Sequence, residues 1–166
     1  VAEIFINGQR HLIGSIYCRP HNSPNSSSTP DNFSSITDNI KRALQYAKES
    51  NISSVRIYGD FNSRHKDWGD TITSPRGRAL SEFAEEQDLT LNCPFEKTFV
   101  CDNGGSVIDL VLSYGTLDHF VSPQWIEKDV ELFSGAPRRG HYPVLHHVRL
   151  NLANKAPKTQ TPKLFN

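Results

Sequence analysis

A short apolar run that stops at a glycine is the feature that most constrains this chain. Residues 55–58 (V-R-I-Y) are rich in β-branched and aromatic side chains, and Gly59 ends them; this is the pattern of a buried strand whose carboxyl end opens into a loop. Asp60 and Asn62 follow two positions apart, so their side chains leave an extended segment on the same side. Open α/β sheets bind ligands just beyond such strand ends. The pair therefore predicts a site that can hold a metal, a water molecule or a phosphate oxygen.

A plain turn is the alternative explanation for Gly-Asp-Phe-Asn at 59–62, since turns prefer Gly, Asp and Asn. Two later features favour a site. Asp109 interrupts an apolar strand predicted over 106–113, where a carboxylate costs free energy unless something pairs with it. His141 follows a Pro-Arg-Arg-Gly loop and precedes the apolar strand that begins at Pro143, which makes it the natural partner.

Asp109 and His141 together would make an oriented imidazole. An aspartate bonded to one ring nitrogen fixes the tautomer and favours the protonated ring, which leaves the other nitrogen for a phosphate or for the attacking water. In the alternative, Asp109 is a structural acid bonded to backbone amides and His141 is an exposed loop residue.

Composition and charge exclude several classes of function. The 166 residues, 36% of them hydrophobic, are enough for one globular domain with its own core. Lys plus Arg equals Asp plus Glu at 18 each, so a nucleic-acid partner must meet a local patch rather than a global field. No apolar run reaches membrane-spanning length, so we expect no membrane partner. Cys18, Cys93 and Cys101 lack paired spacing, which argues against zinc and disulfides and fits an intracellular protein.

The order of the predicted elements indicates an α/β (α+β) fold, a β-sheet with flanking helices. Asn7-Gly8 is a hairpin signal between two short strands, and Thr29-Pro30 marks the start of an amphipathic helix. Residues 1–152 form the domain, and 153–166 are a polar, basic linker or tail. The expected strands are 3–6, 11–18, 55–58, 89–92, 98–101, 106–113, 119–130 and 143–152, and the expected helices are 30–47 and 78–87.

Four motifs, in their order and spacing, resemble the endonuclease/exonuclease/phosphatase superfamily. They are Tyr17 at the end of I-G-S-I-Y, G-D-F-N at 59–62, S-V-I-D at 106–109 and G-H-Y-P-V at 140–144. The segments S-R-H-K-D-W-G after Asn62 and P-R-G-R-A-L-S-E-F after Ser74 look most like the endonuclease domain of non-LTR retrotransposons. The likeness runs from about residue 10 to 150. It implies the C-terminal portion of a four-layer sandwich, in which two sheets pack between outer helices.

The resemblance implies a phosphodiesterase that nicks target DNA with Mg²⁺ or Mn²⁺, and an intracellular, nuclear location. Asp60 would bind the metal and position or deprotonate the attacking water, and Asn62 would help hold the water and the phosphate. His141, oriented by Asp109, would hydrogen-bond the scissile phosphate. Tyr17 would reach the phosphate or the leaving oxygen, and Ser106 would bind a phosphate oxygen.

By the same resemblance, the loop after Asn62 would meet the nucleic acid. Arg64 and His65 would face the backbone, and Trp68 would stack on a base. The alternative for Trp68 is a side chain that caps the core.

The chain departs from the family pattern at two places. Gly140 stands where the family has an aspartate, so one metal-facing carboxylate is missing. The early motifs with the principal metal-binding glutamate have no counterpart before Tyr17, and Glu3, which precedes a hairpin, is no substitute. Asp60 is then the one carboxylate near the phosphate, so we expect weak metal binding and an incomplete or weakened nuclease. The competing hypotheses are a catalytically inactive relic that dimerises or binds nucleic acid, and a phosphatase acting on small phosphoesters.

The missing half also predicts an uncovered sheet. Without a second sheet, the apolar side chains of Ile16, Ile57, Ile108 and Leu110 or of their neighbours would face water over a larger area than monomers usually tolerate. We therefore expect a homodimer in which two copies pack sheet against sheet.

Overall fold

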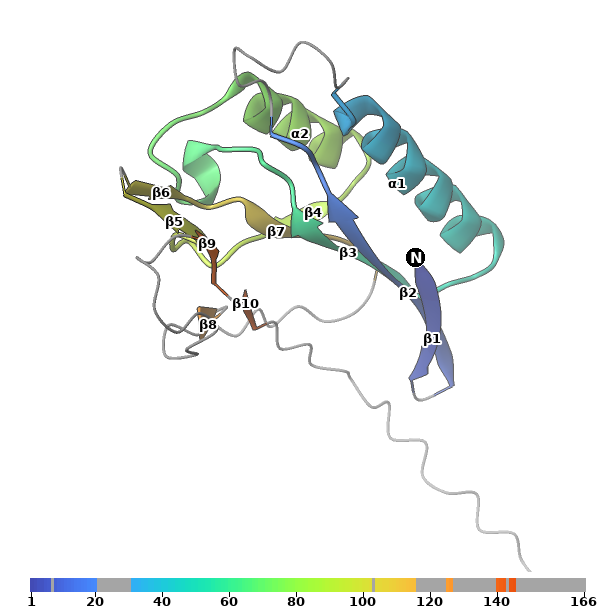
Figure 1. Cartoon of the computed structure of the whole chain (residues 1–166). Helices are drawn as coiled ribbons and strands as arrows, with labels where there is room; N and C mark the ends of the chain where they lie inside the picture. Colours follow the sequence, from blue (N-terminus) through green and yellow to red (C-terminus); the bar gives the residue numbers. More distant parts are fainter. Residues whose placement is uncertain are drawn as a thin grey trace, which may run out of the picture.

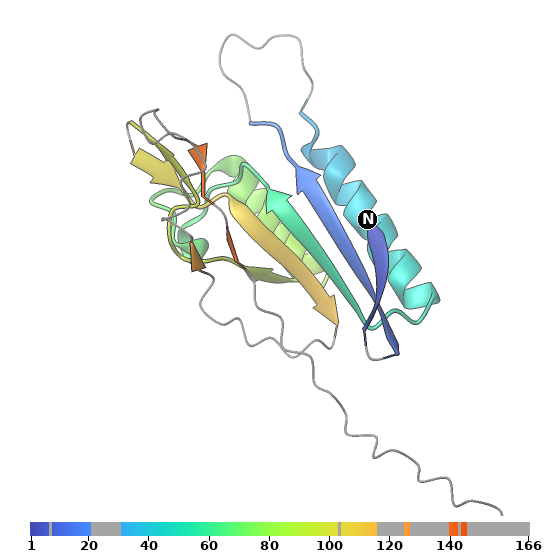
Figure 2. The same ribbon diagram turned by 60° about the horizontal axis from the view of Figure 1, so that its bottom comes forward.

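Two helices pack on one face of a five-stranded sheet (Figures 1 and 2). In this computed structural model the described residues are 1–6, 8–20, 31–102, 104–115, 125–126, 140–142 and 144–145. The strand order of the sheet is β1-β2-β3-β7-β4; β2 and β3 run parallel, and the other neighbours are antiparallel. The predicted mixed α/β fold is confirmed.

The elements follow the predicted order closely. The helices are α1 (Phe33–Glu49), the short 3-10 helix η1 (Lys66–Trp68) and α2 (Pro75–Glu86). The strands of the main sheet are β1 (Ala2–Ile6), β2 (Gln9–Tyr17), β3 (Ser54–Asp60), β4 (Thr90–Asn92) and β7 (Asp109–Gly115). Two smaller sheets are built from β5 (Phe99–Cys101), β6 (Gly104–Ser106), β8 (Trp125–Ile126), β9 (Gly140–His141) and β10 (Val144–Leu145).

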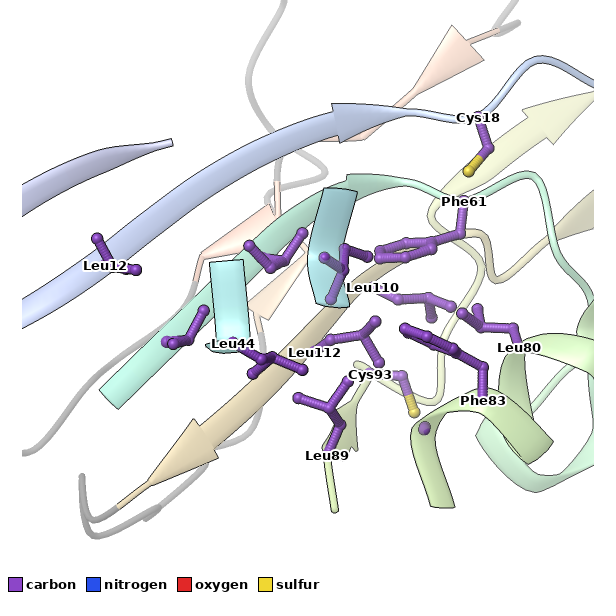
Figure 3. Packing of buried hydrophobic residues seen from close by; sticks show 14 of the residues in the cluster. Leu12, Cys18, Leu44, Phe61, Leu80, Phe83, Leu89, Cys93, Leu110 and Leu112 are labelled. Carbon is purple, nitrogen blue, oxygen red and sulfur yellow. The ribbon is translucent and has the colours of Figure 1, made fainter. Parts of the chain in front are cut away.

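The hydrophobic core lies between the sheet and the two helices. Alternate residues of the strands, such as Leu12, Ile57 and Leu112, point toward the helices and are buried there. The helices contribute to the same core side chains that are spaced three and four residues apart, including Leu44 and Phe83 (Figure 3). All three cysteines lie among the described residues, and none of them forms a disulfide.

The prediction that Ile16, Ile57, Ile108 and Leu110 face water is wrong. Ile57, Ile108 and Leu110 are at most 5% exposed, and Ile16 packs partly buried against the same core. The helices cover the face that carries Ile57 and Leu110. Strand alternation places a mixed set of side chains on the opposite face, which includes Ile13 and Val111 as well as His11, bonded to Ser54 across the strands at 2.9 Å. These four residues therefore give no support to the expected homodimer, which stays a prediction.

Both predicted helices are present, with shifted starts. α1 begins at Phe33 with Asn32 at its N-cap, and the expected capping residues Thr29 and Pro30 lie outside the described residues. α2 begins at Pro75 rather than at residue 78, because the Ser74 side chain accepts a hydrogen bond from the Gly77 amide and caps the first turn. No helix in the described part of the chain is both long enough and apolar enough to cross a bilayer.

The strand predicted over 106–113 is two strands. β6 ends at Ser106 and β7 begins at Asp109, because side chains take the backbone amides between them away from any ladder. The Val107 amide donates to Asp70, and the Ile108 and Asp109 amides both donate to Thr98 Oγ1.

Two predicted strands and the tail fall largely outside the described residues. Within 119–130 and 143–152, the structure describes only the two short strands β8 and β10, which pair with each other antiparallel. The predicted linker over 153–166 is not among the described residues.

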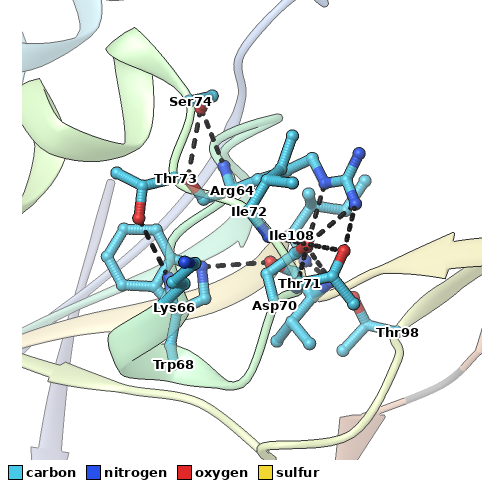
Figure 4. A network of polar contacts seen from close by, with 11 residues as sticks. Arg64, Lys66, Trp68, Asp70, Thr71, Ile72, Thr73, Ser74, Thr98 and Ile108 are labelled. Carbon is cyan, nitrogen blue, oxygen red and sulfur yellow. Dashed lines mark hydrogen bonds and ion pairs between the residues drawn. The ribbon is translucent and has the colours of Figure 1, made fainter.

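The loop that follows β3 is folded around the buried carboxylate of Asp70 (Figure 4). One oxygen accepts hydrogen bonds from Arg64 Nε at 2.9 Å and from the Thr71 amide at 2.6 Å, and the other accepts from the Val107 amide at 3.0 Å. Burial by itself would raise the pKa of Asp70, but the hydrogen bonds from Arg64 and the backbone outweigh it and lower that pKa. Asp70 therefore joins the loop to the residues just before β7.

We expect Asp70→Asn to lower the free energy of unfolding by about 1–3 kcal/mol, because the neutral amide leaves buried donors without an acceptor. The measurement is urea denaturation at pH 7. The folded-state pKa lies below the ordinary 3.8, so the contribution of Asp70 is complete above that value and disappears as the pH falls through the folded pKa. The matched control is Asp67→Asn in the same loop, whose side chain is 78% exposed and which we expect to change stability by less than about 0.5 kcal/mol. Equal losses in both variants would contradict the assignment.

Candidate active site

The ends of three neighbouring strands bring predicted residues together at one end of the sheet. Tyr17 ends β2 and is the register partner of Asp60, which ends β3. Asp60 is in turn the register partner of Asp109, the first residue of β7. Residues 17, 60 and 109 therefore form a single row across three paired strands, although they are far apart in the sequence. Their side chains share one face of the sheet, the one turned away from the helices.

The predicted contact between Asp109 and His141 is present. His141 Nδ1 lies 2.9 Å from Oδ2 and 3.1 Å from Oδ1 of Asp109, so the ring donates its Nδ1 proton to this carboxylate. His141 Nε2 lies 3.7 Å from Asp60 Oδ2. The imidazole thus stands between two carboxylates, with a side chain that is still 43% exposed.

Asn62 holds Asp60 in place. Its backbone amide donates to Asp60 Oδ1 at 2.8 Å, and its side-chain nitrogen donates to Asp60 Oδ2 at 2.9 Å and to the Cys18 carbonyl at 2.7 Å. Asn62 has a φ of +45°, a left-handed conformation that asparagine tolerates better than most residues. Both N–H groups of the side-chain amide are engaged inside the protein, so in this structure Asn62 positions Asp60 instead of offering donors to a phosphate.

The pKa of Asp60 is raised from its ordinary value. Burial is the largest cause, and the neighbouring charge of Asp109 adds to it; the hydrogen bonds from Asn62 and the nearby His141 act in the opposite direction. A carboxylate with a raised pKa accepts a proton more readily, which suits a general base.

Thr98 connects the whole arrangement, although it is not among the residues predicted for the site. This fully buried residue accepts hydrogen bonds at Oγ1 from the Ile108 and Asp109 amides, both at 3.0 Å. Its own backbone bonds to the Ser106 carbonyl at 2.9 Å and to the Tyr142 amide at 2.7 Å. One threonine therefore fixes the start of β7 and the residue after His141. No local pattern marks it, because its partners are distant in sequence.

Ser106 lies in the same small sheet as His141. Ser106 on β6 pairs with Phe99 on β5, and Phe99 pairs with His141 on β9. The rings of Phe99 and His141 are 5.0 Å apart between centroids. The β5–β6 hairpin thus places a serine two strands away from the imidazole.

The prediction that Trp68 stacks on a nucleic-acid base is wrong. Trp68 is 2% exposed, and its indole Nε1 donates to the Val107 carbonyl at 3.2 Å. The alternative, a side chain that caps the core, is correct. Its partners in the loop also turn inward: the ring of His65 packs on Trp68 at 4.8 Å, and Arg64 pairs with Asp70. The predicted contacts of Arg64 and His65 with a nucleic acid stay predictions.

The described residues do not fit a complete magnesium site. Mg²⁺ requires close to six oxygen ligands, and the described part of the chain contains no group of three or more His, Cys, Asp or Glu side chains arranged to hold a metal. Glu3 is occupied by Arg10, at 2.5 and 2.8 Å, which supports the view that it replaces no metal ligand. Gly140 has a φ of +139°, where a residue with a side chain such as aspartate would be strained. Asp60 stays the one predicted metal ligand.

Comparison with known proteins places this chain in a family. A family model described as endonuclease-reverse transcriptase matches residues 11–134. The chain is also 37% identical over 69 residues to a protein of Drosophila melanogaster named "Probable RNA-directed DNA polymerase from transposon BS". That match covers 40% of this chain and only 8% of the relative. The range matched by the family model includes Tyr17, Asp60, Asn62 and Asp109 of the candidate site. The chain belongs to the endonuclease-reverse transcriptase family, as a non-LTR retrotransposon endonuclease domain.

Proposed function

We propose that this domain cleaves the phosphodiester backbone of DNA and nicks target DNA for retrotransposition. The observation that carries the proposal is the row of carboxylate, imidazole and carboxylate formed by Asp60, His141 and Asp109 at the end of the sheet. Membership of an endonuclease family supports the reaction class. A nuclear location belongs to the same proposal, because the target DNA lies there.

Asp60 is the proposed general base. Its carboxylate accepts a proton from the water that attacks phosphorus, and its raised pKa brings its basicity nearer to the working pH. Asn62 fixes the orientation of the carboxylate through both of its oxygens. The base is therefore ready before substrate binds, and little reorganisation is needed during the reaction.

His141 is the proposed partner of the phosphate. Asp109 holds Nδ1, so Nε2 of this 43% exposed side chain is left to donate a hydrogen bond to a phosphate oxygen as negative charge grows there. Two hydroxyl groups flank this position in the proposal. Tyr17, 57% exposed beside Asp60, would reach the phosphate or the leaving oxygen, and Ser106 would bind a phosphate oxygen.

Dependence on Mg²⁺ or Mn²⁺ belongs to the proposal, because nucleases of this family generally use divalent metals. Ligands in addition to Asp60 would be needed, and the DNA and water can supply oxygens of the kind that these ions prefer. The roles given to Asp60, His141 and Asp109 stand on their own contacts.

A binding module without catalysis is the second candidate. It is favoured by the lack of a metal-holding group among the residues that the structure describes. Retained DNA binding with no nicking under any divalent ion would select this candidate.

In a plasmid-nicking assay with Mg²⁺ or Mn²⁺, we expect Asp60→Ala and His141→Ala each to lower the rate by on the order of 10²–10⁴-fold, because each removes a proton-transfer or charge-stabilising group. Asp38→Ala, at an exposed position on α1, is the matched control and should leave the rate unchanged. Chelation by EDTA should stop nicking. Equal activity in all three variants and the wild type would mean that the nicking comes from elsewhere.

The acidic limb of the nicking rate should lie above the ordinary pKa of 3.8, because the base loses activity as the pH falls through the raised pKa of Asp60. We expect Asn62→Gly to move this limb to higher pH. Glycine keeps the left-handed backbone but removes the side-chain hydrogen bond that lowers this pKa. The measurement is the pH profile of the rate, together with the carboxyl carbon shift of Asp60 by NMR. A limb that moves to lower pH would refute the assignment.

A further inference from the structure

The start of α2 contacts two segments that lie next to Asn62, the loop after Asn62 itself and the backbone after β2. In the loop, the Ser74 amide donates to the Arg64 carbonyl at 2.8 Å, and the Arg64 amide donates to Ser74 Oγ at 3.2 Å. Gly77 packs against the same carbonyl so closely that a Cβ there would lie 1.9 Å from Arg64 O. The backbone two residues after Asn62 is therefore tied to the start of the helix.

Arg76, also in the first turn of α2, binds the backbone just after the end of β2. Its side chain is buried, with 4% of the residue exposed, and one guanidinium nitrogen donates to the Arg19 carbonyl. The other terminal nitrogen donates to Asp31 Oδ1 at 2.7 Å, and the guanidinium lies over the ring of Phe33 at 5.7 Å. Burying this cation would be costly without such partners.

The contact with Arg19 leads directly to the site. Cys18, the residue before Arg19, accepts the side-chain amide of Asn62 at its carbonyl and donates its own amide to the Asp60 carbonyl at 2.8 Å. Tyr17 immediately precedes it. The backbone that Arg76 binds thus includes the Cys18 carbonyl, which accepts a hydrogen bond from Asn62, and continues into Tyr17, the predicted phosphate-binding tyrosine.

We propose that Arg76 is a positioning residue for the site: through the Cys18–Arg19 backbone it sets the orientation of Asn62, and through Asn62 that of Asp60. Arg76 touches neither substrate nor reacting atoms. The inference rests on the proposed function for its catalytic consequence, while the orientation of Asn62 can be measured without activity. A lysine cannot replace it fully, because only the guanidinium fork reaches two acceptors in different directions.

The test compares Arg76→Met and Arg76→Lys with Arg78→Met, an exposed arginine two positions further along α2. The first readout is the side-chain amide of Asn62 in ¹⁵N NMR, assigned with Asn62→Gly. We expect Arg76→Met to shift this resonance and speed its exchange with water, because its acceptor at Cys18 moves. Arg76→Lys should restore part of the wild-type signal, and Arg78→Met should leave it unchanged.

The second readout is nicking. We expect Arg76→Met to lower kcat by on the order of tenfold to a hundredfold, with a much smaller change in KM for DNA, because misplacement of the base affects the reaction more than binding. If Arg76→Met does not fold, Arg76→Lys is measured in its place. An Asn62 resonance unchanged in the Arg76 variants overturns the proposal, whatever the rates are. A changed resonance in a protein whose wild type never nicks DNA supports the positioning role and refutes the proposed function.

Discussion

Two carboxylates face each other across paired strands at the edge of the sheet, and much of the surrounding structure compensates for their mutual repulsion. Asp60 and Asp109 are direct register partners on β3 and β7, an arrangement that destabilises a sheet when both are charged. His141 stands between them, and Asn62 hydrogen-bonds both oxygens of Asp60. Burial and the charge of Asp109 still leave the pKa of Asp60 raised. A carboxyl group with a raised pKa of this kind is typical of sites where a side chain takes part in proton transfer.

The loop between Asn62 and α2 makes this compensation possible. Its polar groups turn inward, with Asp70 at the centre and Trp68 against the core, so that the chain leaving Asp60 has a fixed course. The same loop delivers Arg64 to the cap of α2. The two helices therefore do more than cover the apolar face of the sheet, because the start of α2 also contacts the segments that follow β2 and β3, at Arg19 and Arg64.

Local patterns in the sequence predicted the parts of this structure that depend on local rules. The apolar run before Gly59, the hairpin at Asn7-Gly8 and the helical spacing of α1 all led to the observed elements. The cost of an unpaired carboxylate in an apolar strand was enough to predict that Asp109 would meet His141.

The remaining features depend on contacts between distant segments, for which one sequence carries no period or motif. The break between β6 and β7 arises because Thr98 and Asp70 capture three backbone amides, and neither residue stands out in the sequence. Trp68 was misassigned for a related reason. An aromatic residue in a polar loop looks exposed until the partner of its indole, the Val107 carbonyl, is known. Ile16, Ile57 and Leu110 do lie in strands but pack in the core instead of facing water, and Ile108 lies buried between β6 and β7.

Thr98 makes the geometry of the site depend on the stability of the short β5–β6 hairpin. β5 and β6 have three residues each, and so short a pair is barely stable without support. The hydroxyl and backbone of this threonine join the hairpin to the start of β7 and to Tyr142. Any fluctuation that lifts the hairpin away from the sheet therefore also releases Asp109 and His141 from their common alignment. Local opening of this corner would dismantle the carboxylate and imidazole array as one cooperative event, while the helices and the central strands remained folded.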